Sequence, residues 1–139
     1  MRYLGVDPGG RRIGFAAGDD VTGVVSPLEV ASCGNTKDAV RLIVEIARKV
    51  DAACIVVGLP IGADGARGPA CRRSEKLAAE LSAQGIEVAL QGEYLSTDEA
   101  RRRARRVGRP DRSPVDDIAA QILLEDYLAI RANTAAEEA

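Results

Sequence analysis

Three carboxylates stand where apolar segments of the chain end or begin. Asp7 ends a first apolar segment just before a Pro-Gly-Gly turn, Glu93 follows a later one, and Asp116 lies at the start of a C-terminal helical pattern. Carboxylates that converge from separate elements repel one another unless a cation neutralises them. Hard divalent cations such as Mg²⁺ and Mn²⁺ prefer oxygen ligands. The three residues therefore form a candidate site for Mg²⁺ or Mn²⁺.

Each of these carboxylates also has a purely structural interpretation. An Asp before Pro-Gly often shapes a turn, and a Glu after a strand is often solvated. An Asp in the first helical turn is stabilised by the helix dipole and could form a capping box with Ser113. Asp116 also lies in line with Ala120 and Leu123, so it begins an apolar face that predicts packing on a sheet. Asp117 points about 100° away on the helix and is the second candidate.

The absence of histidine narrows the chemistry. The 139 residues contain no His, 21 Asp and Glu, and 19 Lys and Arg. Imidazole-based triads, Cys-His pairs and His-ligated zinc are thereby excluded. Carboxylate-held cations need no imidazole, because two of them about 4 Å apart activate water and stabilise the leaving oxygen in phosphodiester cleavage. The composition is thus compatible with metal-assisted hydrolysis of phosphodiesters.

The hydrophobic pattern predicts a small α/β domain that would position these residues. Short apolar segments joined by tight turns predict strands, and apolar residues at helical spacing predict helices. Strands are expected over 2–7, 13–18, 21–30, 53–58 and 86–90, and helices over 36–50, 69–83, 98–107 and 113–132. The expected helix N-caps are Thr36, either Ser96 or Thr97, and Ser113.

This order of elements predicts the architecture. An antiparallel β-meander followed by β-α-β units forms a mixed five-stranded sheet with helices on both faces. We expect a single domain over residues 1–132 and a flexible tail over residues 133–139. If the first and last strands are neighbours, Glu93 faces Asp7.

Four segments resemble the YqgF/RuvX-like family, whose members are named as Holliday-junction resolvases or pre-16S rRNA nucleases. They are DPGGRRIGFAAGDDVTG (7–23), VVGLPIGADGARGP (56–69), LSTDEAR (95–101) and VDDIAAQILLEDYL (115–128). They cover nearly the whole chain in the family's order. The resemblance implies an RNase H-like fold and a metal-dependent endonuclease. It also implies that Asp7, Glu93 and Asp116 are the catalytic, metal-binding carboxylates, which selects Asp116 over Asp117.

Basic residues near this site are candidate contacts to nucleic acid. Seven of the 19 Lys and Arg residues fall in residues 101–112, where a solvated helix face is the alternative interpretation. The candidates are Arg11, Arg12, Arg67, Arg72, Arg73, Arg101, Arg102 and Arg105. The chain has only three Tyr, one Phe and no Trp for base stacking. Shape recognition of structured RNA or branched DNA is therefore favoured over reading of single strands.

Two positions depart from the family's pattern around the glutamate. Gly92 and Tyr94 stand where the family usually carries Asp and Arg. Arg binds a phosphate or carboxylate through two parallel hydrogen bonds, which Tyr cannot replace. The departure predicts a different substrate orientation or slow turnover. The alternative function is therefore a nucleic-acid-binding module in ribosome maturation or transcription, with little or no catalysis.

The remaining sequence features concern location and assembly. The N-terminal segment lacks the apolar region of a signal peptide, and the three cysteines show no C-x-x-C spacing. Unpaired thiols suit a reducing compartment. We therefore expect a cytoplasmic protein that is not held in a membrane, as a monomer or a homodimer.

Overall fold

The computed structural model describes residues 1–60, 68–93 and 97–138 of the chain. After an initial run of three strands, helices and strands alternate as far as the third helix, and a fourth helix ends the order. The strands are β1 (Arg2–Pro8), β2 (Arg12–Asp19), β3 (Val25–Ser32), β4 (Cys54–Pro60) and β5 (Glu87–Glu93), and the helices are α1 (Thr36–Lys49), α2 (Pro69–Ala83), α3 (Thr97–Arg106) and α4 (Asp116–Glu138).

The strands form one mixed five-stranded sheet in the order β3-β2-β1-β4-β5. The β1–β2 and β2–β3 pairs are antiparallel, whereas the β1–β4 and β4–β5 pairs are parallel. The predicted α/β architecture, a meander followed by β-α-β units, is confirmed. Because β1, β4 and β5 run in parallel, their carboxyl ends share one edge of the sheet, where Asp7 and Glu93 lie.

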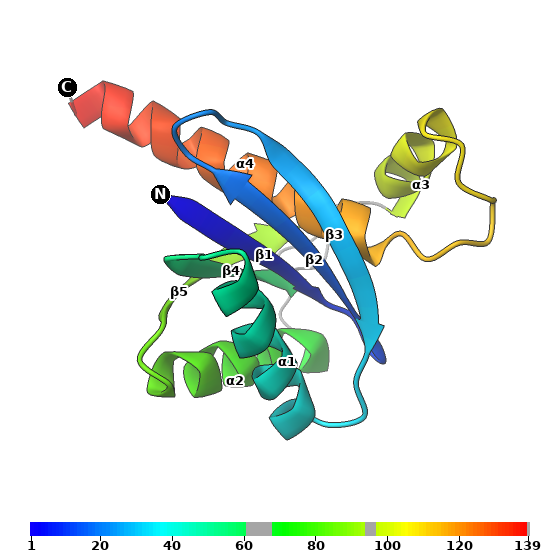
Figure 1. Cartoon of the computed structure of the whole chain (residues 1–139), viewed down its shortest axis with the longest axis horizontal. Coiled ribbons are helices and arrows are strands. Elements are labelled where there is room, and N and C mark those ends of the chain that lie inside the picture. Colours follow the sequence, from blue (N-terminus) through cyan, green and yellow to red (C-terminus); the bar gives the residue numbers. More distant parts are fainter. Residues whose placement is uncertain (61–67, 94–96, 139) are drawn as a thin grey trace.

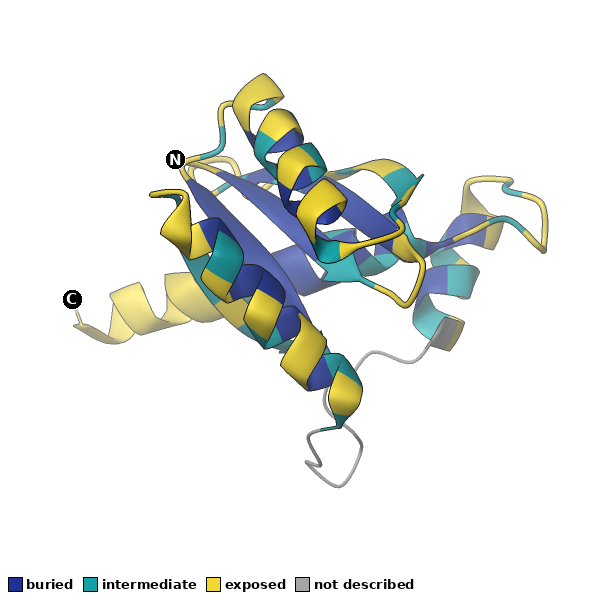
Figure 2. Cartoon of the chain, turned by 90° about the horizontal axis from the view of Figure 1, so that it is seen from below, coloured by how far each residue is buried: buried dark blue, intermediate teal, exposed yellow. Residues whose placement is uncertain are grey.

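Helices cover both faces of the sheet, α1 and α2 on one side and α4 on the other (Figure 1). Alternate residues of the strands explain the two apolar layers. Leu4 and Val6 of β1 pack in the layer with α1 and α2, and Tyr3 packs in the layer with α4. The outer surfaces of α1 and α2 are exposed, whereas the sheet between the helices is buried (Figure 2). Helix α3 packs on α4 around Ala100 and Ala104.

Two predicted boundaries near the N-terminus are wrong, each because of a side chain that bonds to the backbone. Strand β3 begins at Val25 rather than residue 21. The Asp19 carboxylate accepts the backbone N–H of Val21 at 2.7 Å, which closes a turn ahead of the strand. Helix α1 is capped by Asn35 rather than Thr36, because the Asn35 side chain accepts the backbone N–H of Asp38 at 2.8 Å.

The last helix differs from its predicted limits at both ends. Ser113 is not its N-cap, because α4 begins at Asp116 and its first turn is closed by Ala119 N–H donating to Val115 O at 2.9 Å. At the other end α4 continues to Glu138 rather than ending at residue 132, so residues 133–138 are helical. Residues 129–138 are exposed, and this end of α4 projects beyond the sheet (Figure 2). Among the described residues, no helix combines the length and apolarity needed to cross a membrane.

Candidate active site

Asp7 lies near the carboxyl end of β1, at the centre of the sheet. It pairs with Gly14 of β2 in the antiparallel register, and Gly9 N–H donates to its carbonyl oxygen at 3.1 Å in the following turn. Asp7 belongs to the same alternate set of β1 positions as Tyr3, which packs towards α4. The strand therefore presents Asp7 on the α4 side of the sheet.

Asp116 reaches the same place because α4 begins directly above Gly14. A Cβ atom on Gly14 would overlap the carbonyl group of Asp116 and lie 2.6 Å from the backbone nitrogen of Asp117. Glycine is thus the residue that allows the helix backbone to touch the sheet here. Since Gly14 is also the partner of Asp7, the close approach brings the first residue of α4 to the end of β1.

The two carboxylates line one cavity of about 240 Å³, which we call the β1–α4 pocket. Its lining combines these acids with three arginines and small residues that come mainly from α3 and the segment before α4. The lining residues are Asp7, Arg12, Ala100, Arg101, Arg112, Ser113, Pro114, Val115, Asp116 and Ala119. Opposite charges in one small cavity suit a ligand that carries both a cation and phosphate groups.

Asp116 faces Arg12 across this pocket. The Arg12 Nε atom lies 3.0 Å from the Asp116 Oδ2 atom, and the two side chains are 54% and 17% exposed. Oδ2 itself is buried and accepts no hydrogen bond from the described residues, because the Arg12 N–H is not directed at it. The contact is therefore an ion pair without a directed hydrogen bond, and the oxygen keeps its lone pairs for another partner.

Asp117 has a different role from its neighbour. Its side chain is only 6% exposed and accepts two hydrogen bonds from Arg109, at 2.8 and 2.7 Å. These bonds raise the pKa of Arg109, although burial opposes the shift. The pair ties the segment before α4 to the first turn of the helix. Asp117 is absent from the lining of the β1–α4 pocket, so the structure distinguishes the two acids.

Glu93 is the last residue of β5 and pairs with Pro60 of β4. The condition under which Glu93 would directly face Asp7, that the first and last strands are neighbours, is not met, because β4 lies between β1 and β5. Val6 pairs with Val57 and Gln91 pairs with Gly58, so Glu93 lies two residues beyond the level of Asp7 along the parallel strands. The register still assigns Glu93 to the same alternate set of positions as Asp7. Its side chain lies outside the described part of the structure.

The predicted basic residues separate into groups. Arg12 and Arg101 line the β1–α4 pocket, and Arg112, which the sequence-based candidates did not include, joins them. Arg11 and Arg73 instead line a second cavity of about 220 Å³ on the side of the sheet covered by α1 and α2.

The other predicted arginines lie away from both cavities or are engaged within the protein. Arg102 pairs with Glu99 at 2.7 Å, and this hydrogen bond lowers the pKa of Glu99. Arg72 and Arg105 are exposed on α2 and α3. Arg67 lies outside the described residues.

The pocket has the donor chemistry that a divalent cation requires. Asp7 and Asp116 supply carboxylate oxygens, and Asp116 Oδ2 is buried without a directed donor in the described structure. Over the described side chains, no cluster of three or more His, Cys, Asp or Glu forms a ready metal site. Two carboxylates fit a cation that also takes water or substrate oxygens, which is the coordination typical of Mg²⁺.

This sheet order, with a C-terminal helix carrying an acid to the end of the first strand, defines a protein of the RNase H-like fold. The RuvC protein of Thermus thermophilus in complex with Holliday junction substrate shares it, with a TM-score of 0.63 and 15% identity over 96% of this chain and 97% of that one. The Holliday junction resolvase of fowlpox virus also does, with a TM-score of 0.57 and 14% identity over 93% of this chain and 99% of that one.

Sequence similarity then specifies the family within this fold. The chain belongs to the RuvX family, described as Holliday junction resolvase, which residues 1–130 match. A relative from Anaeromyxobacter sp. (strain Fw109-5), named "Putative pre-16S rRNA nuclease", is 39% identical over 132 residues, covering 92% of this chain and 96% of the relative. A relative of the same name from Acidiphilium cryptum is 34% identical over 136 residues, covering 91% of this chain and 83% of the relative.

Proposed function

We propose that this protein is a divalent-cation-dependent endonuclease that hydrolyses phosphodiester bonds in structured nucleic acid. Membership of the RuvX family makes the chain a nuclease. The observation that carries the proposed mechanism is the convergence of Asp7 and Asp116 in one pocket with three arginines. The substrate would be precursor 16S rRNA at its 5′ end or a Holliday-junction-like DNA, and rRNA maturation would place the protein in the cytoplasm.

Asp7 and Asp116, with Glu93 from the end of β5, would hold the cation. A divalent cation in such a site supplies an activated water and charge stabilisation for the leaving oxygen. The guanidinium groups of Arg101 and Arg112 would bind phosphates on either side of the scissile bond, because they line the same pocket as the carboxylates. Asp116 is the first residue of α4, where a negative side chain interacts favourably with the positive end of the helix dipole.

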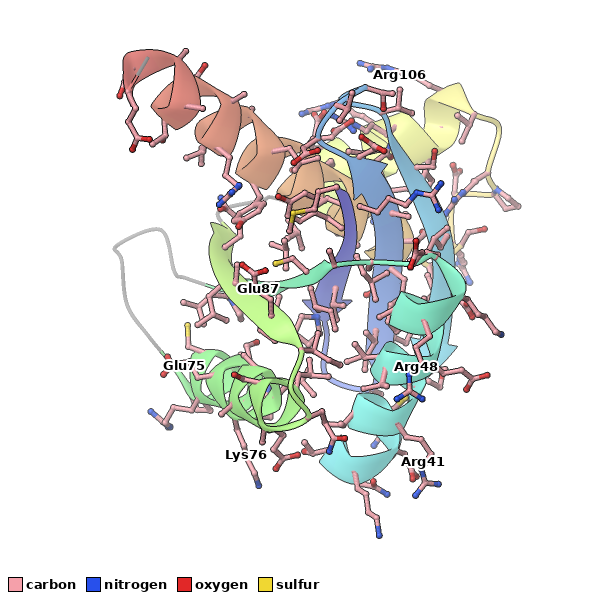
Figure 3. The ribbon with its side chains drawn as sticks, turned by 60° about the vertical axis from the view of Figure 1, so that its left-hand side comes forward. Arg41, Arg48, Glu75, Lys76, Glu87 and Arg106 are labelled. Atoms are coloured by element: carbon pink, nitrogen blue, oxygen red, sulfur yellow. The ribbon has the colours of Figure 1, made fainter. Side chains whose placement is uncertain are left out.

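Recognition would depend on the backbone and shape of the nucleic acid rather than on its bases. Tyr3 and Phe15 are buried in the core, and Tyr127 packs edge to face on Tyr3 with ring centroids 5.9 Å apart. These rings are not available as stacking platforms for single-stranded bases. The α3 surface by contrast carries exposed arginines such as Arg106 (Figure 3). Binding should therefore weaken steeply as salt is raised.

Cleavage assays on the two substrate classes test this function. We expect the purified protein to cut a four-way DNA junction or an RNA duplex with precursor-like ends when Mg²⁺ or Mn²⁺ is present, and to cut neither in EDTA. Asp7→Asn replaces a cation-binding carboxylate by a neutral amide. It should reduce the cleavage rate by about 10³-fold, since the cation lowers the barrier by several kcal/mol. The rate on each substrate, compared at equal cation concentration, identifies the preferred class.

A control variant that leaves the β1–α4 pocket unchanged accompanies Asp7→Asn. Arg48→Gln changes an exposed residue of α1 on the far side of the molecule from α3 (Figure 3), and it should cut like the wild type. A wild type that binds both substrates in a salt-sensitive manner but cuts neither would contradict the proposal. It would support the alternative of a binding module, for which the Gly92 and Tyr94 departures are the sequence argument.

A further inference from the structure

Arg12 and Asp116 form an ion pair whose geometry would allow it to break when a ligand enters the pocket. Arg12 is the first residue of β2, and its side chain is 54% exposed, so it has room to turn towards solvent. Asp116 is fixed at the start of α4, and its buried Oδ2 lies 3.0 Å from Arg12 Nε without a directed hydrogen bond. The acid is fixed by its place in the helix, whereas the arginine contacts it, within the described part of the chain, through charge and without a directed hydrogen bond.

A positive charge beside Asp116 stabilises the pocket when no cation is bound. Asp7 and Asp116 line the same small pocket, so their negative charges destabilise each other when nothing positive lies between them. The guanidinium group remains charged at every physiological pH and offsets part of that repulsion. A divalent cation would bind the same Asp116 oxygen, so cation and guanidinium compete for it.

We propose that Arg12 is a positioning residue that exchanges partners: it holds Asp116 in the cation-free protein and turns to a phosphate of the nucleic acid once a cation is bound. This inference rests on the proposed function. After the exchange the guanidinium remains at the pocket rim beside Arg101 and Arg112, where a phosphate backbone would pass.

Arg12 is the arginine that the structure pairs with Asp116, whereas two nearby arginines bond to other groups. Arg101 donates from Nη1 to the carbonyl oxygen of Asp111 at 3.1 Å, and Arg109 is fixed by its two bonds to Asp117. Arg11, the preceding residue, lines the cavity on the opposite side of the sheet. Arg11 is therefore the matched control, since it has the same charge and adjacent sequence position but lies away from Asp116.

Isothermal titration of the nucleic-acid-free protein with MnCl₂ measures the first consequence. Arg12→Gln should bind Mn²⁺ roughly 2- to 5-fold more tightly than the wild type, because a competing charge is removed and ion pairs of this exposure contribute up to about that factor. Arg11→Gln should bind Mn²⁺ like the wild type. An unchanged or weaker affinity in Arg12→Gln, with an unchanged melting temperature, would overturn the exchange.

The second consequence is a change in how strongly the cation increases affinity for nucleic acid. Affinity for a four-way junction is measured with and without Ca²⁺, and an electrophoresis gel confirms that the junction stays intact. In the wild type the cation should strengthen junction binding by releasing Arg12 to a phosphate. In Arg12→Gln this gain should fall by roughly 2- to 5-fold, because the residue that couples the two ligands is missing. Arg12→Lys keeps a positive charge and should restore most of the gain, which a purely structural role would not predict.

The outcomes separate this inference from the function on which it rests. A wild type that binds no Mn²⁺ contradicts the proposed cation site itself. A wild type that binds Mn²⁺ and cuts nucleic acid, together with an Arg12→Gln variant whose cation affinity and coupling are unchanged, contradicts only the exchange.

Discussion

Asp116→Asn is expected to slow cleavage strongly without destabilising the fold, whereas Asp117→Asn is expected to destabilise the fold while the protein still cuts. Asp116 lines the pocket, and its ion pair with a half-exposed Arg12 contributes only about 0–1 kcal/mol to stability. Losing its charge should slow cleavage by about 10³-fold, because the cation would lose one of its anionic ligands. The melting temperature should stay within about 3 °C of the wild type.

Asp117→Asn is the matched variant on the adjacent residue. Its carboxylate is 6% exposed and accepts two hydrogen bonds from Arg109, whose side chain is 29% exposed. Breaking this pair should cost about 1–3 kcal/mol, which is below the value for a fully buried pair because Arg109 retains some solvent. Thermal unfolding should show a fall of roughly 3–10 °C. If Asp117→Asn stopped cleavage at unchanged stability, or Asp116→Asn still cut, the assignment of the two acids would be reversed.

Gly14→Ala is expected to damage both stability and cleavage, because a methyl group there collides with backbone rather than with a movable side chain. The new Cβ would overlap the carbonyl group of Asp116 and approach the nitrogen of Asp117 to 2.6 Å. The first turn of α4 must move away from the sheet, at a cost of about 1–3 kcal/mol. A displacement of about 1 Å at Asp116 should lower the cleavage rate by roughly 10²-fold.

The control for this variant is Gly10→Ala in the β1–β2 turn. Apart from its chain neighbours, a Cβ atom on Gly10 meets no atom of the described residues within 4 Å, so the variant should melt and cut like the wild type. Melting curves and single-turnover cleavage rates of the two variants make the comparison. A Gly14→Ala protein with wild-type stability and rate would show that the α4 backbone does not depend on this close approach.

Local patterns in the sequence were sufficient for most elements of the fold. Helix α2 occupies the predicted residues 69–83, because Pro69 and a clear apolar period mark its limits. The order of strands in the sheet is a non-local property, so local patterns left open whether the first and last strands are neighbours, and β4 in fact lies between them. The predicted start of β3 was wrong because the Asp19 side chain closes a turn ahead of the strand. The predicted ends of α4 were wrong because the helix begins at Asp116 and continues to Glu138 along exposed residues.

The candidate site was predictable in its residues but not in its contacts. Asp7 and Asp116 were identified from their places beside apolar segments and from the family resemblance, and the fold brings them into one pocket. Which arginines face that pocket could not be read from the run at residues 101–112. Arg103 is engaged by Glu125, 22 residues away in α4, and such pairings depend on packing rather than on sequence spacing.

Locating a bound Mn²⁺ ion by anomalous X-ray scattering is the most direct test of the carboxylate site. Crystals of the wild type and of Asp116→Asn would be soaked in MnCl₂ at a concentration that supports cleavage in solution. We predict an anomalous peak bonded to carboxylate oxygens of both Asp7 and Asp116 in the wild type, and its loss in Asp116→Asn. A peak found only at other acidic residues, or one that persists unchanged in the variant, would contradict a cation site built from the end of β1 and the start of α4.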